Sequence, residues 1–568
     1  MAGNEENMKF RITRWFLLAA LLSSLGGSTL LSQETDYEKW LKKEQEKFQQ
    51  FRDERDKEFT EFLKREWKEM QAMQGTLPDT IPKPVRVPIY VPPPQVPKDT
   101  ASKPVIIKET PVPKRVEELP GKVPSPLPQA PKDTASRPVV IKETPVPKRV
   151  EEPPAKPPSP VPQAPKDAES QPVVIKEILV PKREEVPAAH IPPLLSSPAK
   201  RFTTLDVPFF NAMLTLQRDD SLKMKLTGKI DKDAISDCWA ALSRSNYEEL
   251  LAQLQDDRNQ MKLNDWGYAL LLNQVGHKLF GSRNEAALFA WFMLAKSGYD
   301  AKIGYSADQI RLLLPTTNRL FYVPYFTFDN DARRFYVAAI EPGEKPFDGH
   351  LFTYEGKYPG ADKNTDFVVK SIPNLNHVVA ERKLRFSYGG KDFSFDIKLS
   401  KDAVEFFREY PLMNFEVYFG SATSPEAAQT LLSQWRPIVQ GKTEQEAVNM
   451  VLRFVQTAFD YKTDPEQFGR EKPLFPDETL FYPFCDCEDR SILFSYMVKN
   501  LFGLDVVALD YPGHIATAVK FSGGISGDSI QFRGATYTIC DPTYINADIG
   551  VCMPQFKSVN PNVIVIPN

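Results

Sequence analysis

From Arg201 onward, the hydrophobic and polar positions of this chain follow the periods of helices and strands. Helical patterns dominate as far as Lys296, and a strand-rich stretch follows. In the sequence LRFSYGGKDFSFDIKL, at residues 384–399, apolar side chains alternate with polar ones on both sides of a Gly-Gly pair, which predicts a β-hairpin. We therefore expect an α+β fold for this part of the chain.

Two helices are predicted after this hairpin from the residues with which they begin. One begins at Ser424 and has Pro425 in its first turn. The other begins at Thr443, and Glu446 three residues later completes a capping box. The apolar residues of the second helix recur at helical spacing until the sequence FDYKTD, so we expect one buried face.

Residues 37–73 carry a repeat with a period of eleven residues. Pairs of apolar residues recur at this spacing among charged neighbours: Tyr37 and Trp40, Phe48 and Phe51, Phe59 and Phe62, Met70 and Met73. Eleven residues make about three helical turns, so the apolar stripe stays on one face of an amphipathic helix, which we assign to residues 35–75. Two uses of the stripe stay open: packing on the protein's own body, or self-association and surface binding.

A proline-rich repeat separates this helix from the folded region. Of the 51 prolines in the chain, 32 lie in residues 77–199, where Tyr90 is the one aromatic residue. A 34-residue unit starts at Pro97 and returns at Pro131, and a truncated third copy follows. Frequent prolines exclude helices, and one aromatic residue is too few to build a core. Residues 78–200 are therefore predicted to form a disordered, polyproline-like stalk.

The N-terminus has the pattern of an export signal. Lys9, Arg11 and Arg14 precede the apolar sequence WFLLAALLSSLGGSTLL, which predicts a signal peptide at residues 1–32, with retention as a single membrane anchor as the alternative. Either way we expect the chain outside the cytoplasm of a bacterium, in the periplasm or at the cell surface, where free thiols tend to oxidise. The formal net charge of −3 gives no indication of a nucleic-acid partner.

The candidate chemistry lies in the sequence YPFCDCEDRSILFSYM, at residues 482–497. Asp486 is suited to cap a helix that begins at Cys487 and has Asp489 at its third position. The helix dipole favours the thiolate of such a cysteine, whereas neighbouring carboxylates oppose it, so a cationic partner is needed. His514 is the one histidine that follows the cysteines, in the sequence LDYPGHIATAV.

A Pro-Gly turn places His514 at the start of a strand, and a second strand, ATYTICDPTY, runs into Asp541. Two adjacent strands can set the imidazole beside the carboxylate, with Cys487 at the same cleft, which is the arrangement of nucleophile, base and orienting group. A C-x-D at a helix start, a histidine on one strand and D-P-T on the next resemble the transglutaminase-like superfamily. The resemblance covers roughly residues 443–543.

This resemblance implies a papain-like fold and a Cys-His-Asp triad in residues 441–568. It assigns Cys487 as the nucleophile, His514 as the general base and acid, and Asp541 as the residue that orients the imidazole. Ala516 stands where the family often has an aromatic residue, so the shape of the substrate cleft departs from the family pattern.

Supporting roles are assigned to Tyr482 and Asp489. Tyr482, together with the backbone N–H of Cys487, is a candidate for stabilising an oxyanion, and Asp489 is a candidate for supporting the site. No calcium-site pattern stands out, and we expect neither a cofactor nor a metal.

Three structural alternatives for the cysteines stay open. Cys485 could form a disulfide with Cys540 or Cys552, which export would permit and which would leave Cys487 free. Cys485, Cys487, His514 and Cys540 could bind zinc, although a C-x-C spacing is tighter than usual for zinc ligands. Cys487 could also be purely structural, at a well-capped helix start.

An earlier segment is similar to the candidate site at a constant offset of 205 residues. Five residues match identical residues at this offset: Leu288, Phe289, Gly298, Asp300 and Ile310. The offset puts Ser282 at the place of the nucleophile and Gln309 at the place of the histidine, and a glutamine cannot act as a base. We hypothesise that residues 240–340 are a degenerate copy of the catalytic unit, used as a scaffold or for substrate binding.

The predicted organisation has six parts in chain order: a signal peptide at 1–32, a helix at 35–75, a stalk at 78–200, a helical or α+β domain at 201–340, a strand-rich domain at 341–440 and a transglutaminase-like domain at 441–568. The sequence predicts an exported cysteine enzyme that acts on amide, peptide or isopeptide bonds through a thioester, with hydrolysis favoured over transfer. The expected partner is a peptide or protein substrate, including cell-wall peptide. The alternative is a catalytically inactive papain-like binding or scaffold protein on a stalk.

Overall fold

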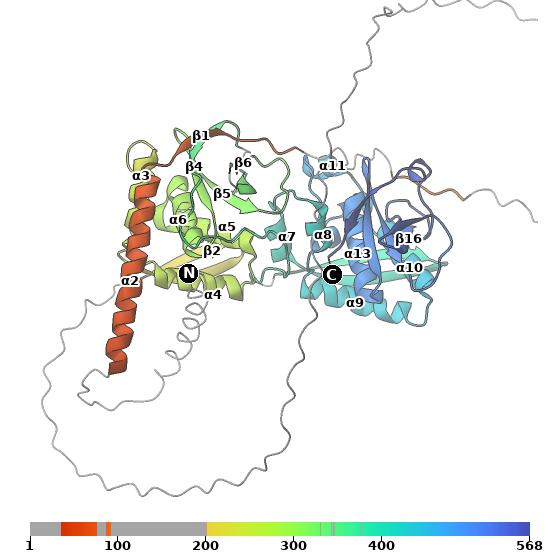
Figure 1. Cartoon of the computed structure of the whole chain (residues 1–568). Coiled ribbons are helices and arrows are strands. Elements are labelled where there is room, and N and C mark those ends of the chain that lie inside the picture. The colour runs from red at the N-terminus through yellow and green to blue at the C-terminus, as the bar shows by residue number, and fades with distance from the viewer. Residues whose placement is uncertain are drawn as a thin grey trace, which may run out of the picture. The chain divides into compact units, whose positions relative to one another are not determined.

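The computed structural model describes residues 36–76, 87–92 and 202–567, apart from five single positions: 330, 342, 345, 346 and 377. The predicted signal peptide and almost all of the predicted stalk lie outside the described residues. The described part contains helices and sheets and is α+β, as expected (Figure 1). Its two large sheets are antiparallel. Among its helices, none combines the length and the apolar character needed to cross a membrane.

The first half of the folded region begins with a hairpin and four helices. These are β2 (Phe202–Phe209), β3 (Ala212–Asp219), α3 (Lys232–Ser243), α4 (Glu248–Gln260), α5 (Asp265–Phe280) and α6 (Arg283–Lys296). A six-stranded sheet follows, with the strand order β1-β8-β4-β5-β7-β6. Its strands are β1 (Lys68–Gln71), β4 (Lys302–Tyr305), β5 (Ile310–Thr316), β6 (Tyr325–Phe328), β7 (Asp331–Val337) and β8 (His350–Thr353).

The second half again begins with a hairpin and helices. These are β9 (Val379–Tyr388), β10 (Lys391–Ser400), α7 (Lys401–Phe407), α8 (Phe415–Phe419), α9 (Pro425–Val439) and α10 (Glu444–Thr457). Short elements lead to the long helix α13 (Cys487–Phe502): β11 (Asp460–Tyr461), α11 (Asp464–Phe468), α12 (Pro476–Phe481) and β12 (Phe484–Cys485). A five-stranded sheet of order β15-β16-β14-β13-β17 completes it. Its strands are β13 (Asp505–Tyr511), β14 (His514–Lys520), β15 (Ser529–Phe532), β16 (Ala535–Cys540) and β17 (Asn562–Val565).

Local signals account for several of these elements. The predicted hairpin is β9–β10, and Gly389 and Gly390 turn it with φ angles of 57° and 74°, values that suit a type I′ turn. The predicted helix starts are confirmed, since Ser424 and Thr443 accept hydrogen bonds from the backbone N–H groups of Ala427 and Glu446.

The hairpin β9–β10 packs on α9 and α10, and aromatic rings fill the contact. Trp435 on α9 is fully buried and stacks on Phe395 at 5.1 Å, while Phe386 and Phe454 lie 5.5 Å and 5.4 Å from the same indole. The predicted separate strand-rich domain at 341–440 is therefore wrong. This stretch contains three helices, and its hairpin shares a core with the segment that follows.

The two large sheets repeat one topology. In the first, β4, β5, β7 and β6 are neighbours in that order, and in the second, β13, β14, β16 and β15 are. β8 pairs with β4 and β17 pairs with β13, both antiparallel. The hairpin registers also agree, because Lys302 pairs with Leu313 and Val507 pairs with Ala518, each 205 positions further along. The helices α6 and α13 precede these hairpins. Each end of α13 lies within one residue of the position that the offset of 205 predicts from α6.

The predicted helix over 35–75 is wrong in its last part. The helix α2 spans Asp36–Leu63, and the chain then forms β1, where Met70 pairs with Leu351 of β8. Pairing with a strand far along the chain satisfies the backbone there, and it prevails over the helical period of the side chains.

The apolar stripe of α2 is divided between two environments. Phe59 is 3% exposed and packs edge-on against Trp239 of α3 at 4.7 Å between ring centroids. Towards the N-terminus of α2, Trp40 and Phe51 are 50% and 52% exposed. One end of the helix is thus held to the protein's own body, and the self-association of its other end stays a prediction.

Candidate functional site

Cys487 is the first residue of α13, as the sequence predicts. The backbone N–H of Asp486, the N-cap residue, donates to the Asp489 carboxylate at 3.2 Å, which fixes the entry into the helix. Helix α13 packs on β14, and the Ser491 hydroxyl donates to the carbonyl of Ile515 at 3.2 Å. The thiol of Cys487 is fully buried at this contact.

His514 and Asp541 lie side by side on neighbouring strands. His514 is the first residue of β14, Asp541 directly follows β16, and the two strands pair. The Nε2 atom of His514 is 2.9 Å from Oδ2 of Asp541, and both side chains are buried. The ring of Phe556 stacks on the imidazole at 5.2 Å, with 5° between the ring planes. The imidazole is therefore oriented from one side by a carboxylate and covered on one face.

The thiol of Cys487 is bonded to a carboxylate. Its Sγ donates to Oε2 of Glu488 at 3.3 Å, and no hydrogen bond of the described residues joins it to His514. Burial raises the pKa of the thiol well above its usual value, and the negative charges of Glu488 and Asp486 raise it further. The backbone N–H of Ile515 acts in the opposite direction. The thiol is therefore protonated in this arrangement.

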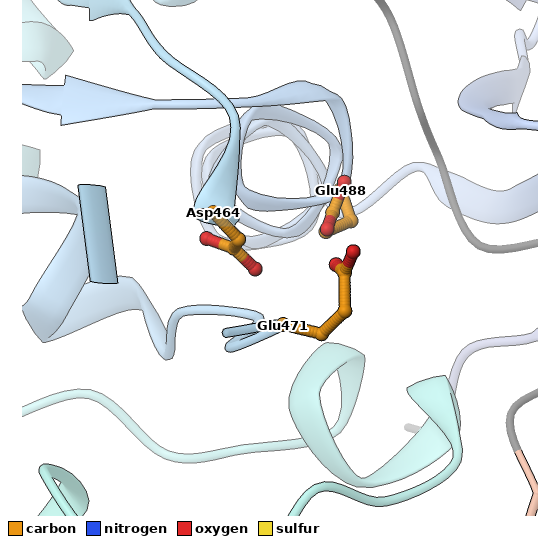
Figure 2. A group of neighbouring side chains, drawn as sticks. All are labelled: Asp464, Glu471 and Glu488. Atoms are coloured by element: carbon orange, nitrogen blue, oxygen red, sulfur yellow. The ribbon is translucent and has the colours of Figure 1, made fainter. Parts of the chain in front are cut away.

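A group of carboxylates surrounds the start of α13. Asp464, Glu471 and Glu488 point toward one another (Figure 2). Asp486 and Asp489 form an overlapping group with Asp464, and in each group the oxygen atoms lie within 4.8 Å of one another. Burial and then mutual repulsion raise the pKa of the Asp464, Asp486 and Asp489 carboxyls. We did not predict this group, because Asp464, at the start of α11, and Glu471, in the loop after it, come well before Cys487 and no short motif connects them to α13.

Gln456 on α10 was also not predicted as a residue of the site. It is 1% exposed, and its Nε2 donates to three backbone carbonyls, those of Asp541, Tyr544 and Ala547, at 2.9–3.1 Å. Its Oε1 accepts from the backbone N–H of Asn546 at 3.1 Å. One amide group thus holds the loop that carries Asp541.

The contacts of Tyr482 and Asp489 are structural. The ring of Tyr482 packs edge-on against Phe468 and Phe481, and its carbonyl accepts from Arg382. The carboxylate of Asp489 accepts from the backbone N–H groups of Leu474 and Asp486. A role of Tyr482 at an oxyanion stays a prediction, and Asp489 supports the site by capping α13.

The alternative of a disulfide between Cys485 and Cys540 or Cys552 is not seen in the structure, where all five cysteines are free and buried. The thiol of Cys485 lies 3.5 Å from Nε of Arg490, whereas Cys540 donates to the carbonyl of Thr538 in its own strand. Cys552 lies beside Tyr511 in a small separate cluster.

The zinc alternative is also wrong for this structure. In the part of the chain that the structure describes, the two groups of side chains close enough to share a metal ion consist of carboxylates alone. Cys485, Cys487, His514 and Cys540 do not form such a group.

The equivalent positions in the first half carry other side chains than Cys487, His514 and Asp541. Ser282 caps α6 and its hydroxyl donates to Glu285, while the side chain of Gln309 accepts from Arg311. Leu313 pairs with Val337 and Ala518 pairs with Ile539, so Ala339 occupies the position of Asp541. A cavity of about 580 Å³ lies at this place, and Arg283, Gln309 and Arg311 are among the residues that line it.

A short described piece of the proline-rich region lies against the loop of Asp541. The backbone N–H of Tyr90 donates to the carbonyl of Ile545 at 2.8 Å, and the N–H of Ile545 donates to the carbonyl of Pro88 at 2.9 Å. The ring of Tyr90 meets Tyr544 edge-on at 5.7 Å and joins a cluster that includes Phe556, the residue that stacks on His514. An extended segment is thus bound next to the candidate site.

Comparison of this chain with protein-family models, with curated proteins and with solved structures gave no match.

Proposed function

We propose that this protein is a transglutaminase-like cysteine enzyme that acts on amide, peptide or isopeptide bonds. The observation that supports it is the buried hydrogen bond, 2.9 Å long, between His514 and Asp541 on neighbouring strands. The helix that begins at Cys487 packs on the strand that begins at His514, so the three groups come from elements in mutual contact. A buried carboxylate that orients an imidazole near a thiol is the arrangement of nucleophilic catalysis.

In the proposed reaction, Asp541 fixes the orientation of the imidazole through Nε2. His514 takes the proton of Cys487, and the resulting thiolate attacks the carbonyl carbon of the substrate. The C–N bond breaks, the leaving amine takes the proton from His514, and a thioester remains. Water then hydrolyses the thioester with His514 as the base, which releases the acid and restores the thiol. Before attack, the thiol must leave its hydrogen bond to Glu488.

The proposed substrate is an extended peptide. Residues 87–92 support this, because they run as an extended segment along Ile545 with two backbone hydrogen bonds. Such main-chain pairing is a common way to bind an extended peptide. In this proposal, the first half of the folded region is a degenerate copy that serves as a scaffold. Export to the periplasm or cell surface stays a prediction, since residues 1–32 lie outside the described part.

The test is the reactivity of the five thiols towards iodoacetamide at neutral pH, with the labelled sites identified by mass spectrometry. Cys487 should be labelled first in the folded protein. His514→Ala and Asp541→Asn should slow this labelling at least tenfold, because the imidazole that accepts the proton is lost or misoriented. Cys552→Ala is the matched control and should leave the labelling of Cys487 unchanged. Release of amine from peptide libraries, with Cys487→Ala as the inactive control, then defines the substrate.

A second candidate function is that of a catalytically inactive binding protein. The observation that favours it is the thiol itself, which is fully buried and bonded to Glu488. In that case, Cys487 should be labelled no faster than Cys552 in the folded protein, and Cys487→Ser should leave peptide binding unchanged. This outcome would refute the enzymatic proposal.

A further inference from the structure

Residues 87–92, which we call the strap, bind the second half of the folded region through their backbone. The N–H of Tyr90 donates to the carbonyl of Ile545 at 2.8 Å, and the N–H of Ile545 donates to the carbonyl of Pro88 at 2.9 Å. The two bonds form a parallel bridge, so the strap is added to this loop as a strand is added to the edge of a sheet.

The side chains of the strap alternate between the protein and the solvent. Pro88 and Tyr90 are partly buried, and the ring of Tyr90 meets Tyr544 edge-on at 5.7 Å. Ile89 and Val91 are 63% and 78% exposed. This is the alternation of a strand with one face on a surface, so Tyr90 and Val91 offer a contacting and a solvent-facing position in the same segment.

The strap lies on the loop that supplies Asp541. The backbone N–H of Tyr544 donates to Oδ1 of Asp541 at 3.2 Å, and Oδ2 of the same carboxylate is 2.9 Å from Nε2 of His514. The residue that the ring of Tyr90 contacts is therefore joined to the imidazole through one carboxylate.

The strap also packs on the residues that support the cover of the imidazole. Tyr90 and Phe556 both pack against one small buried cluster, whose members are Tyr544, Ala547 and Met553. Phe556 stacks on the ring of His514, which is 4% exposed, and Cys487 is fully buried. The candidate site is thus closed to a substrate while the strap is bound.

The loop under the strap is held without it. Gln456 binds this loop from the core, since its amide donates to three backbone carbonyls and accepts from one backbone N–H. A half-exposed attachment adds little to a loop that a buried amide already fixes. The backbone N–H and carbonyl of Ile545, beside an aromatic ring, are instead what an extended peptide uses to bind.

We propose that the strap inhibits the candidate site from within the chain, because it occupies the surface on which an extended peptide substrate binds. This proposal rests on the proposed function and adds the kind of peptide, one with an aromatic residue two positions after a proline, as in Pro88-Ile89-Tyr90. A tethered segment competes at an effective concentration on the order of millimolar, so a free peptide gains the surface mainly when the strap leaves. The cluster then loses the ring of Tyr90, and Phe556 can turn away from the imidazole.

The experiment uses the full chain and the peptide VPIYVPPP, the sequence of residues 87–94, with a fluorophore at its N-terminus. Fluorescence anisotropy measures its binding. Tyr90→Ala should bind this peptide at least tenfold more tightly than the wild type does, because apparent affinity falls with the fraction of molecules whose site is occupied. Val91→Ala is the matched control and should bind the peptide as the wild type does, since its side chain is exposed.

The second measurement is the rate at which iodoacetamide labels Cys487. Tyr90→Ala should raise this rate at least fivefold, and saturating peptide should return it to the rate of the wild type. Equal affinity of the wild type and Tyr90→Ala for the peptide would overturn the proposal, and so would an unchanged or lower rate of labelling in Tyr90→Ala.

Both measurements are repeated with His514→Ala in the background. Access to the surface and to the thiol does not depend on the imidazole, so Tyr90→Ala should again bind the peptide more tightly and be labelled faster. Failure of the strap is seen as loss of the effect of Tyr90→Ala, whereas failure of the enzymatic proposal is seen as loss of the effect of His514→Ala. Each proposal can therefore fail without the other.

Discussion

Replacement of Gln456 by methionine tests how the loop of Asp541 is held. Methionine has a similar volume and keeps the side chain in the core, but it removes the amide. The substitution leaves three carbonyls, those of Asp541, Tyr544 and Ala547, without their donor, and the N–H of Asn546 without its acceptor. Because Gln456 is 1% exposed, water does not replace these bonds.

The expected loss of stability follows from these bonds. An intramolecular hydrogen bond contributes about 1 kcal/mol net, and a buried polar group left without a partner costs about 1–3 kcal/mol. The amide of Gln456 has two hydrogens for three carbonyls, so one hydrogen is shared and the sum is less than for four separate bonds. We expect Gln456→Met to lower the free energy of unfolding by about 3–5 kcal/mol.

The assay is urea unfolding followed by tryptophan fluorescence, together with the rate of Cys487 alkylation. Gln434→Met is the matched control, because Gln434 makes a similar set of bonds, to the backbone of Asp396 and Thr430, at the partly exposed surface of α9. We expect this control to lose less than about 1 kcal/mol, since water can replace its bonds. An equal loss in the two variants would refute the reasoning, because it would mean that burial of the amide does not matter.

Three further predictions concern the core, a buried acid and the segment 87–92. Trp435→Ala should lower the free energy of unfolding by about 3–5 kcal/mol in urea, since it empties the stack on Phe395; a loss under 1 kcal/mol would contradict this. Burial raises the pKa of Asp477 to about 6, so its contribution to stability is present below about pH 4 and is lost as the pH rises through 6. Relative to the wild type, Asp477→Asn should therefore gain about 2–3 kcal/mol between pH 4 and 7, and a constant difference would argue against the shift. Tyr90→Ala should speed hydrogen exchange of the amide at residue 90, which bonds to Ile545, at least tenfold; unchanged exchange would show that the ring does not hold the segment.

Elements set by neighbouring residues could be predicted from the sequence. The start of α13 at Cys487 was predicted because a short polar residue such as Asp486 is common at the N-cap, and the structure closes this start with the bond from the N–H of Asp486 to Asp489. The nearness of His514 and Asp541 was predicted from two adjacent strands, and the structure pairs these strands, although β15 lies between them in the sequence. The triad as a catalytic unit goes beyond this geometry and stays a proposal.

Features set by distant residues could not be predicted in the same way. Helix α2 ends at Leu63 because the chain after it pairs with β8, nearly 300 positions later. The amide of Gln456 and the carboxylate of Asp464 reach the site from earlier segments, where no motif in the sequence connects either residue to Cys487. Whether Cys485 forms a disulfide depends on distances between thiols, which a count of cysteines does not contain.

The repeated topology allows one more step, from a comparison of equivalent backbone groups in the two halves. At the start of β5, the N–H of Ile310 donates to Oδ1 of Asn284 at 2.9 Å, so this donor is satisfied by a side chain of the first turn of α6. At the equivalent position of β14, the N–H of Ile515 faces the sulfur of Cys487 and favours its thiolate. The residue at the place of Asn284 is Asp489, which instead accepts from the backbone of Leu474 and caps its own helix. The N–H of Ile310 in the first half is thus bound by an amide oxygen, whereas the N–H of Ile515 in the second half faces a sulfur. Cys487→Asn tests whether this difference is structural. If it is, the asparagine should accept from the N–H of Ile515 and raise the free energy of unfolding in urea. An unchanged or lower free energy of unfolding would show that this position suits a thiol and not an amide.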